Sequence, residues 1–433
     1  MTGQHIQQRK HALQDLDGRC LSLFVFHALI VLEIVLFCIA KIRTTRRNGF
    51  GAATTWATAV LFVFVVSALL PGPSAAAEAQ TPAPVVAAPS PPPPAAAASA
   101  PSWLRVPRLQ GRLTAADLGL LINTADPYSV AVGEYYASRR GIPEANIARV
   151  VLPLKARLTA AEFADLQLQL QDKLGPQVQA LALAWTMPYA VECNSITSAL
   201  GLGFQPELCQ NSCGVSKLSP YFSYLGARPH ADLGMRPAML LASRSVEAAQ
   251  ALIERGIESD QSLPAFTSAN AYFVSTPDAA RNVRAAQFPP ATLLKPWGLE
   301  VRRESSSALP ALQRTLFYMT GLTRVAGLDS VDWLPGALAD HLTSYGGQLD
   351  NLGPGGQMSA LDWLQAGATA SYGTVSEPCN HLQKFPHPQL LLLFYLQGVT
   401  ALEAYWHSVA WPAQGVFVGE PLAAPFAPKF APR

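Results

Sequence analysis

Past about residue 103, short apolar runs alternate with longer segments whose apolar residues recur at helical spacing. The runs 118–123, 147–152 and 181–185 are typical of buried strands, and 129–140 and 159–174 between them are typical of amphipathic helices. Strands that alternate with helices along a chain usually pair in parallel, and the helices cover the faces of the sheet. The sequence therefore predicts an α/β fold, a mainly parallel sheet flanked by helices.

The same alternation continues toward the C-terminal end, so we expect a single α/β domain over 103–433. Further strands are predicted at 237–242, 271–275, 315–319, 334–340 and 369–375, and further helices at 246–255, 358–366, 390–396 and 402–406. The interval 189–236 is long, irregular and Cys-bearing. We expect it to form a loop insertion over one end of the sheet, where α/β proteins place their sites.

Two apolar stretches precede this domain, at about 20–40 and 52–70, and each is near the length that crosses a bilayer. The second follows the basic segment 41–47 and ends at a small-residue cleavage pattern, so 51–79 is interpreted as a signal peptide or an anchor. Two interpretations of 1–50 stay open: a transmembrane segment, or a start codon assigned too far upstream.

The stretch 80–102 is a Pro/Ala-rich linker, and ten prolines fall within 71–102. Such a composition buries too little apolar surface to offset the entropy of ordering, so we expect a disordered tether rich in polyproline II. Both interpretations of the N-terminal region place the domain outside the cytoplasm. It is expected in the periplasm, at the cell surface or anchored to the membrane, and the membrane is the one partner that the sequence indicates.

The charge balance excludes one class of function. The formal net charge is +2, and the positive excess lies in residues 1–102, which leaves the rest of the chain close to neutral. A neutral domain lacks the basic surface that neutralises nucleic-acid phosphates, so no nucleic-acid partner is expected. No glycine-rich phosphate loop follows the first predicted strand, so no cofactor is expected either.

Four cysteines lie in the exported part of the chain: Cys193, Cys209, Cys213 and Cys379. In an oxidising compartment four cysteines indicate two disulfides, for which three connectivities are open. One alternative is a metal site in which His381 or Cys193 joins Cys209 and Cys213. Another alternative is a catalytic thiol at Cys379.

Asp340, His341 and Ser344 form a first polar cluster, at the end of a predicted strand. Aspartate, histidine and serine are the residue types of nucleophilic acyl transfer. Asp340 and His341 are neighbours in a strand, however, and so point to opposite faces of the sheet. The alternative is a hydrogen-bonded strand end followed by a tight turn.

Glu377, Cys379 and His381 form a second cluster, which follows the next predicted strand. Acidic and basic groups held together beyond a parallel strand are suited to general acid–base catalysis. The alternative is structural, because the same residues precede a helix whose first turn Pro386 and Pro388 would suit.

Six segments together resemble a family of exported bacterial proteins, about four hundred residues long, that has no assigned activity. They cover most of 115–426 and are 121–129 (LINTADPYS), 135–143 (YYASRRGIP), 185–189 (WTMPY), 339–347 (ADHLTSYGG), 366–378 (AGATASYGTVSEP) and 419–422 (GEPL). The resemblance implies export and common descent, and it brings no known activity.

The chain also resembles the caspase–gingipain class of cysteine peptidases. In that class a His-Gly pair follows one strand, a Cys follows the next, and a Gly-Ala-x-Ala strand comes later. The segment 367–373 (GATASYG) fits the last of these, whereas Thr320 and Gly321 stand where His-Gly is wanted and 338–344 contains no Cys. The resemblance implies a caspase-like sandwich without its catalytic dyad.

Two hypotheses about function follow. The first is a non-catalytic, caspase-like envelope protein that acts in binding or assembly. A contact surface for it could come from the aromatic residues Tyr405, Trp406, Trp411 and Phe417 near the C-terminal end, although helical spacing favours core burial for most of them. The second is an exported hydrolase that uses residues among Asp340, His341, Ser344, Glu377, Cys379 and His381. The two hypotheses differ in whether those six side chains converge on one open cleft.

Overall fold

An eleven-stranded sheet forms the centre of the computed structural model, which describes residues 102–263, 268–307, 311–350 and 356–428. All of these residues belong to one unit of the chain. The strands are β1 Leu118–Asn123, β2 Ile147–Val150, β4 Ala180–Leu183, β7 Ala238–Leu240, β8 Ala269–Ser275, β9 Thr292–Leu294, β10 Leu299–Ser305, β11 Thr315–Thr320, β12 Trp333–His341, β13 Ala370–Thr374 and β14 Gly415–Gly419. The predicted α/β class with a mainly parallel sheet is confirmed.

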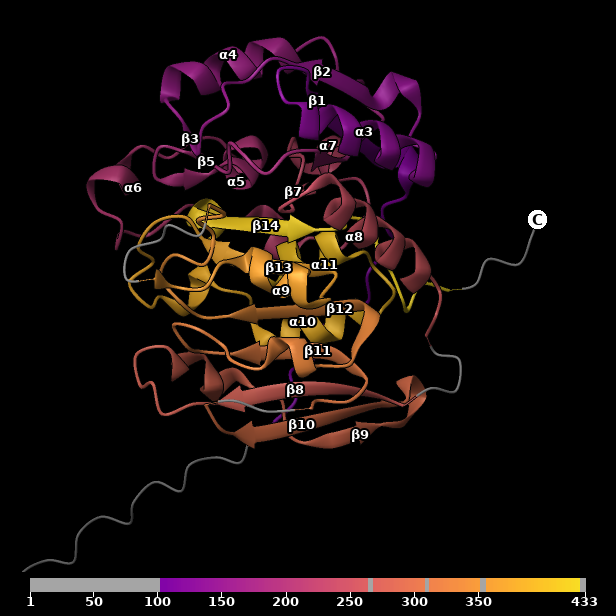
Figure 1. Cartoon of the computed structure of the whole chain (residues 1–433), viewed down its shortest axis with the longest axis vertical. Helices are drawn as coiled ribbons and strands as arrows, with labels where there is room; N and C mark the ends of the chain where they lie inside the picture. Colours follow the sequence, from indigo (N-terminus) through magenta and orange to yellow (C-terminus); the bar gives the residue numbers. More distant parts are fainter. Residues whose placement is uncertain (1–101, 264–267, 308–310, 351–355, 429–433) are drawn as a thin grey trace, which may run out of the picture. The chain divides into compact units, whose positions relative to one another are not determined.

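The sheet consists of two parallel halves that run in opposite directions. Its strand order is β2-β1-β4-β7-β14-β13-β12-β11-β8-β10-β9, from top to bottom in Figure 1. The strands from β2 to β14 are parallel to one another, as are those from β13 to β10, and β9 is an antiparallel edge strand. The two halves meet where β14 pairs antiparallel with β13. The carboxyl ends of the two halves therefore point to opposite edges at this junction.

Nine α-helices lie among the described residues. They are α3 Pro127–Arg140, α4 Ala160–Leu170, α5 Ile196–Leu202, α6 Glu207–Gln210, α7 Pro229–Leu233, α8 Val246–Ser259, α9 Ala360–Ala366, α10 Pro388–Tyr395 and α11 Ala401–Ser408. Apolar residues of α3, α10 and α11 pack on one face of the sheet, and those of α4, α5 and α9 pack on the other. The structure thus has the three layers that the alternating sequence predicts.

Local sequence signals set the ends of the helices. Asp126 accepts a hydrogen bond from the Tyr128 amide at the start of α3, and Gly141 ends this helix in the left-handed conformation at φ 66°. Thr159 and Glu162 form a reciprocal capping box at the start of α4. These caps satisfy backbone groups that the helix ends would otherwise leave unpaired.

The Cys-bearing interval 189–236 contains α5, α6, α7 and two short strands, β5 Ala190–Val191 and β6 Asn194–Ser195. These strands form a second, three-stranded sheet with β3 Arg157–Leu158. Ile196 and Ala199 of α5 pack with the apolar residues of β7 and β14. This part of the interval therefore covers a face of the main sheet.

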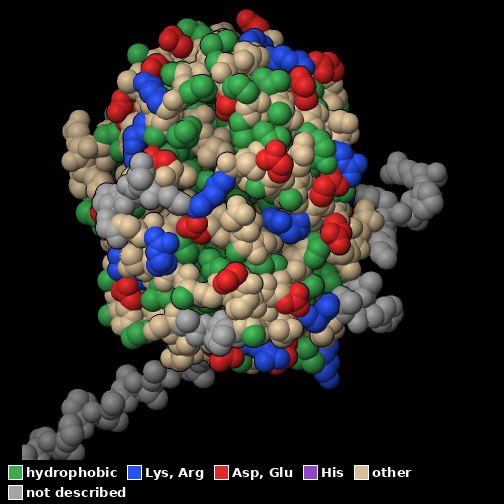
Figure 2. Space-filling view, viewed as in Figure 1, with side chains coloured by type: hydrophobic (Ala, Val, Ile, Leu, Met, Phe, Trp, Pro, Cys, Tyr) green, Lys and Arg blue, Asp and Glu red, His purple; other side chains and the backbone are tan. Residues whose placement is uncertain are grey.

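Core burial, which helical spacing favours for most of the aromatic residues near the C-terminal end, is confirmed for three of the four, and these three do not form a contact surface. Tyr405, Trp406 and Phe417 are fully buried and belong to the main core cluster, and the Trp406 and Phe417 rings stack at 4.7 Å. Helical spacing in α11 and alternation in β14 direct them inward. On the face drawn in Figure 2, basic and acidic side chains are interspersed with apolar ones.

No helix among the described residues is long and apolar enough to cross a bilayer. The expected segments 1–50 and 51–79 lie outside the described residues, as does the linker 80–102 except for its last residue.

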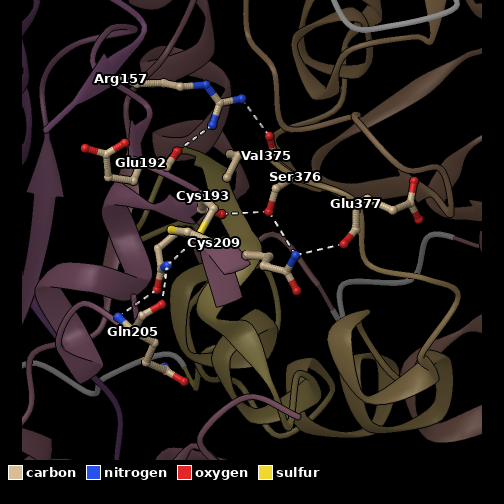
Figure 3. The surroundings of a disulfide bond; sticks show 10 residues. Arg157, Glu192, Cys193, Gln205, Cys209, Val375, Ser376 and Glu377 are labelled. Atoms are coloured by element: carbon tan, nitrogen blue, oxygen red, sulfur yellow. Dashed lines mark hydrogen bonds between the residues drawn. A yellow bond between two sulfur atoms is a disulfide. The ribbon is translucent and has the colours of Figure 1, made fainter. Parts of the chain in front are cut away.

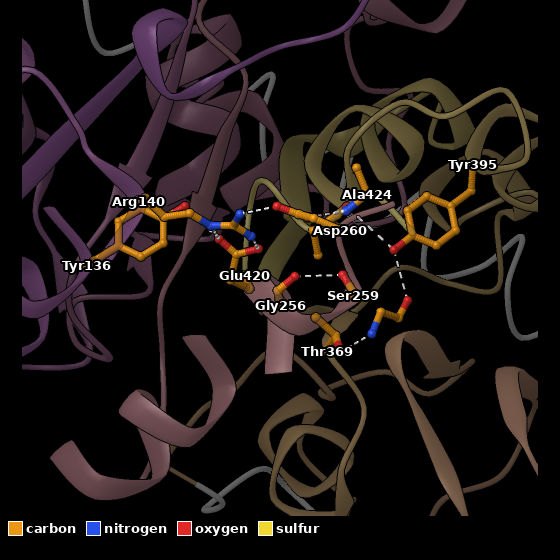
Figure 4. Close-up of polar contacts among 11 residues, drawn as sticks. Tyr136, Arg140, Gly256, Ser259, Asp260, Thr369, Tyr395, Glu420 and Ala424 are labelled. Carbon is orange, nitrogen blue, oxygen red and sulfur yellow. Dashed lines mark hydrogen bonds and ion pairs between the residues drawn. The ribbon is translucent and has the colours of Figure 1, made fainter. Parts of the chain in front are cut away.

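A buried ion cluster joins the end of α3 to the chain beyond β14 and α8 (Figure 4). Arg140 donates from Nε and Nη2 to the two carboxylate oxygens of Glu420, at 2.9 and 2.7 Å, and pairs with Asp260 through Nη1. Tyr136 donates its hydroxyl to Glu420 at 2.8 Å. Glu420 is fully buried, and a Cβ on Gly256 would lie 2.5 Å from its Cγ, so glycine makes room for this carboxylate.

We expect Arg140→Met to lower the free energy of unfolding of the full chain by about 3–5 kcal/mol, because it leaves the Glu420 carboxylate buried without its cation. The matched control is Arg139→Met, which removes an ion pair to Glu254 whose partners are 44% and 40% exposed. An exposed pair contributes under about 1 kcal/mol. Urea unfolding of both variants measures the difference, and equal losses would contradict a structural role for the buried cluster.

Candidate functional site

The two polar clusters of the sequence lie at the carboxyl ends of neighbouring parallel strands, β12 and β13. The loops that follow these strands pack backbone against backbone. The amide of Gly347 donates to the Thr374 carbonyl at 2.9 Å, and the Thr374 hydroxyl donates to the Ser344 carbonyl at 2.7 Å. A Cβ on Gly373 would lie 2.2 Å from the carbonyl carbon of Gly346, so only glycine permits this approach. The loops fill the space between the two strand ends.

Asp340 is buried at the end of β12 in an ion pair with Arg284. Arg284 is also buried, and it donates to the carbonyl oxygens of Thr320 at 2.9 Å and Pro386 at 3.4 Å. Burial raises the pKa of Asp340, and the neighbouring guanidinium offsets part of that rise. The carboxylate therefore serves as counter-ion to a buried arginine.

His341 points to the opposite face of the sheet from Asp340, as strand geometry predicts. Its Nδ1 accepts a hydrogen bond from the Trp363 indole at 2.9 Å, and its Nε2 lies 3.1 Å from the Met358 carbonyl oxygen. These partners require a neutral ring with its proton on Nε2. Burial and the positive charge of Arg284 lower the pKa of His341 to about 3. The imidazole is thus held as a neutral structural group.

Ser344 and the preceding Thr343 are tied to the side chain of Gln357. The Gln357 carbonyl oxygen accepts from the Ser344 amide at 2.9 Å and from the Thr343 hydroxyl. Both ring nitrogens of His341 are already engaged with Trp363 and Met358. Ser344 therefore lies in the turn after β12, and no histidine of the described ranges is hydrogen-bonded to its hydroxyl.

The four cysteines of the described part form two disulfides, Cys193–Cys209 and Cys213–Cys379. The expectation of two disulfides is confirmed, and one of the three open connectivities is selected. A disulfide sulfur is neither a thiolate ligand nor a nucleophile. The metal-site and catalytic-thiol alternatives for these cysteines therefore do not hold in this structure, and no group of metal-ligating side chains gathers among the described residues.

Glu377 and His381 make local contacts beside the second disulfide. The Glu377 carboxylate accepts a hydrogen bond from the Cys379 amide at 2.8 Å, and His381 Nε2 lies 3.0 Å from the Cys213 carbonyl oxygen. Lys384 donates from Nζ to the Ser212 carbonyl at 2.6 Å. Burial lowers the pKa of Lys384 to about 8, and the charge of Glu377 acts against this shift. All three side chains hold the Cys213–Cys379 connection in place.

Arg157 joins this region from far along the sequence, and sequence reasoning missed it. It donates to the carbonyl oxygens of Glu192 at 2.6 Å and Val375 at 2.8 Å, and its guanidinium carbon lies 5.8 Å from the centroid of the Tyr189 ring. Figure 3 shows Arg157 bridging the two chain segments beside the Cys193–Cys209 disulfide. Arg157 opens the two-residue strand β3, and a single arginine in so short a strand carries no sequence signal for such a role.

Ser376 and Gln414 complete the same junction. The Ser376 hydroxyl donates to the Cys193 carbonyl at 2.6 Å, and Gln414 Nε2 donates to the Ser376 hydroxyl at 2.8 Å and to the Glu377 carbonyl at 2.9 Å (Figure 3). The loop after β13 is therefore fixed by polar contacts to the segment around Cys193 and by the disulfide from Cys379 to Cys213.

Arg284 and Trp363 are the other residues that sequence reasoning missed. They determine the state of Asp340 and His341, yet they come from the turn after β8 and from α9.

No family model, curated protein or solved structure matches this chain.

The pH dependence of stability tests the neutral state of His341. Its folded pKa of about 3 lies below the value near 6.5 of an unfolded histidine, so the unfolded chain binds the extra proton. The stability that this group contributes is complete above pH 6.5 and is lost as the pH falls toward 3. We expect the difference in unfolding free energy between the native chain and His341→Gln to shrink by about 2 kcal/mol from pH 7 to pH 5. A constant difference across this range would contradict the neutral buried ring.

Proposed function

We propose that this chain is an exported, membrane-tethered protein whose caspase-like α/β domain acts in binding or assembly in the cell envelope and is not a hydrolase. The observation that carries the proposal is the state of the reactive side chains beyond β12 and β13. Asp340 is in a buried ion pair, His341 is hydrogen-bonded at both ring nitrogens, and Cys379 is in a disulfide. A nucleophile or a general base needs a group that is free to react.

The region where a caspase-like dyad would stand supports the same proposal. The strands that would precede its histidine and cysteine correspond to β11 and β12, which are parallel neighbours. Gly321 after β11 is covered by backbone, because a Cβ at this position would lie 1.9 Å from the Arg281 carbonyl oxygen. Arg284 from the same loop caps the Thr320 carbonyl. This close packing at the end of β11 supports a domain that has no catalytic dyad at these strand ends.

Two features support export and tethering: the disulfides of the domain and the apolar stretches and linker that precede it in the sequence. The two disulfides are compatible with an oxidising compartment outside the cytoplasm. Two apolar stretches of membrane-spanning length and a Pro/Ala-rich linker precede the domain in the sequence. A membrane anchor, a long linker and a disulfide-bonded domain suit a protein that presents a binding surface at a distance from the bilayer.

Mechanism-based probes distinguish the proposal from the hydrolase alternative. The full chain, isolated from an oxidising compartment, is treated with a fluorophosphonate for serine and a peptidyl acyloxymethyl ketone for cysteine, and is assayed against peptide and ester substrate mixtures. We expect no covalent labelling and no turnover above that of Ser344→Ala. Labelling at Ser344 that disappears in His341→Gln, or labelling at Cys379, would establish a hydrolase and overturn the proposal.

A further inference from the structure

The segment 102–113 lies along the domain surface ahead of the first strand and has a regular pattern of burial. Trp103, Val106 and Leu109 are each less exposed than the residues on either side of them, and all three pack on the main core cluster. A spacing of three residues is the period of polyproline II, in which every third side chain falls on one face. We call this segment, 102–113, the strap.

Two glutamine side chains bind the backbone of the strap in the same way. The Gln389 amide oxygen accepts from the Leu104 N–H at 2.8 Å, and its Nε2 donates to the Ser102 carbonyl at 3.2 Å. Gln397 repeats the arrangement with the Leu109 N–H at 2.9 Å and the Pro107 carbonyl at 3.0 Å. Each side-chain amide uses both its donor and its acceptor on residues two apart. This geometry recognises an extended backbone without regard to its side chains.

The strap is not enclosed by the domain. A cavity of about 780 Å³ borders it, and its lining includes Val106 and Leu109 from the strap and Trp297 and Leu396 from the domain. Trp297 is oriented by a hydrogen bond of 3.0 Å from its indole to the Leu396 carbonyl oxygen. An aromatic side chain beside a groove with backbone-directed hydrogen bonds is typical of sites that bind polyproline II peptides.

We infer that α10, the two residues after it and Trp297 form a recognition groove for polyproline II segments with an apolar side chain at every third position. Its ligand in this protein is the chain's own strap, bound reversibly. The strap begins at Ser102, which is also the last residue of the Pro/Ala-rich linker. While the strap is bound, its residues add no length between the linker and the domain. A released strap of a dozen residues lengthens the tether by roughly 35–40 Å, at about 3.1 Å per residue.

Amide hydrogen exchange in the full chain tests the glutamine clamps. We expect Gln389→Met with Gln397→Met to speed exchange of the 103–110 backbone by at least tenfold, because methionine keeps the shape of glutamine but neither accepts nor donates these bonds. Exchange in β11 and β12 serves as the internal reference and stays unchanged. Gln110→Met is the matched control, since Gln110 is an exposed residue of the strap itself. Unchanged protection of 103–110 in the double variant would overturn the inference.

A second measurement tests recognition in trans. A fluorescent peptide of residues 102–113 is titrated into the native full chain and into a full chain whose strap carries Trp103→Asp, Val106→Asp and Leu109→Asp. We expect the variant to bind the peptide at least tenfold more tightly than the native chain, whose groove is already filled. A peptide with its apolar residues moved off the three-residue spacing is expected to bind at least tenfold more weakly. Equal affinity of both chains, equal affinity for both peptides, or no binding to the variant would each overturn the inference.

Discussion

The pairing of β14 with β13 joins two parallel half-sheets of opposite direction, and the layout of the molecule depends on it. Glycine is required at both ends of β14: a Cβ on Gly415 would lie 1.8 Å from the Tyr372 hydroxyl oxygen, and one on Gly419 would lie 2.5 Å from the Ala370 Cα. Because β14 is parallel to β7 on one side and antiparallel to β13 on the other, the two halves present their carboxyl ends at opposite edges of the sheet. They cannot share a single crevice there. The loop after β13 instead contacts the disulfide-bonded segment around Cys193, and the loop after β12 packs against the loop after β13.

Most of the fold could be predicted from the sequence, and the exceptions have physical reasons. Apolar runs and helical spacing located β1, β4, β8, β11 and β13 together with the main helices, because buried parallel strands leave a strong local pattern. The strand β10 was missed, since Arg302, Arg303 and Glu304 interrupt its apolar alternation. The strand β14 was missed because a Gly-flanked run of three apolar residues has no reliable local signal. Its direction, which sets the topology, is a property of contacts far apart in sequence.

The candidate site could be predicted only in part. Strand geometry alone showed that Asp340 and His341 point to opposite faces, and cysteine number alone indicated two disulfides. The sequence did not reveal that Arg284 neutralises Asp340 or that Trp363 holds His341, because both partners come from other elements. The disulfide pairing was likewise open among three connectivities. Tertiary contacts therefore decide whether these residues have catalytic or structural roles. Residue type and spacing in the sequence do not encode such contacts.

The central claim is that the reactive side chains at the ends of β12 and β13 are held in structural bonds and contacts. The oxidation state of Cys379 tests this claim most directly. Differential alkylation with mass spectrometry on the full chain, isolated from an oxidising compartment, measures the state of each cysteine. The structure predicts that Cys379 resists alkylation until reduction and is recovered in a peptide linked to Cys213. A free Cys379 that alkylates rapidly near neutral pH would indicate a thiolate of depressed pKa and would contradict the account.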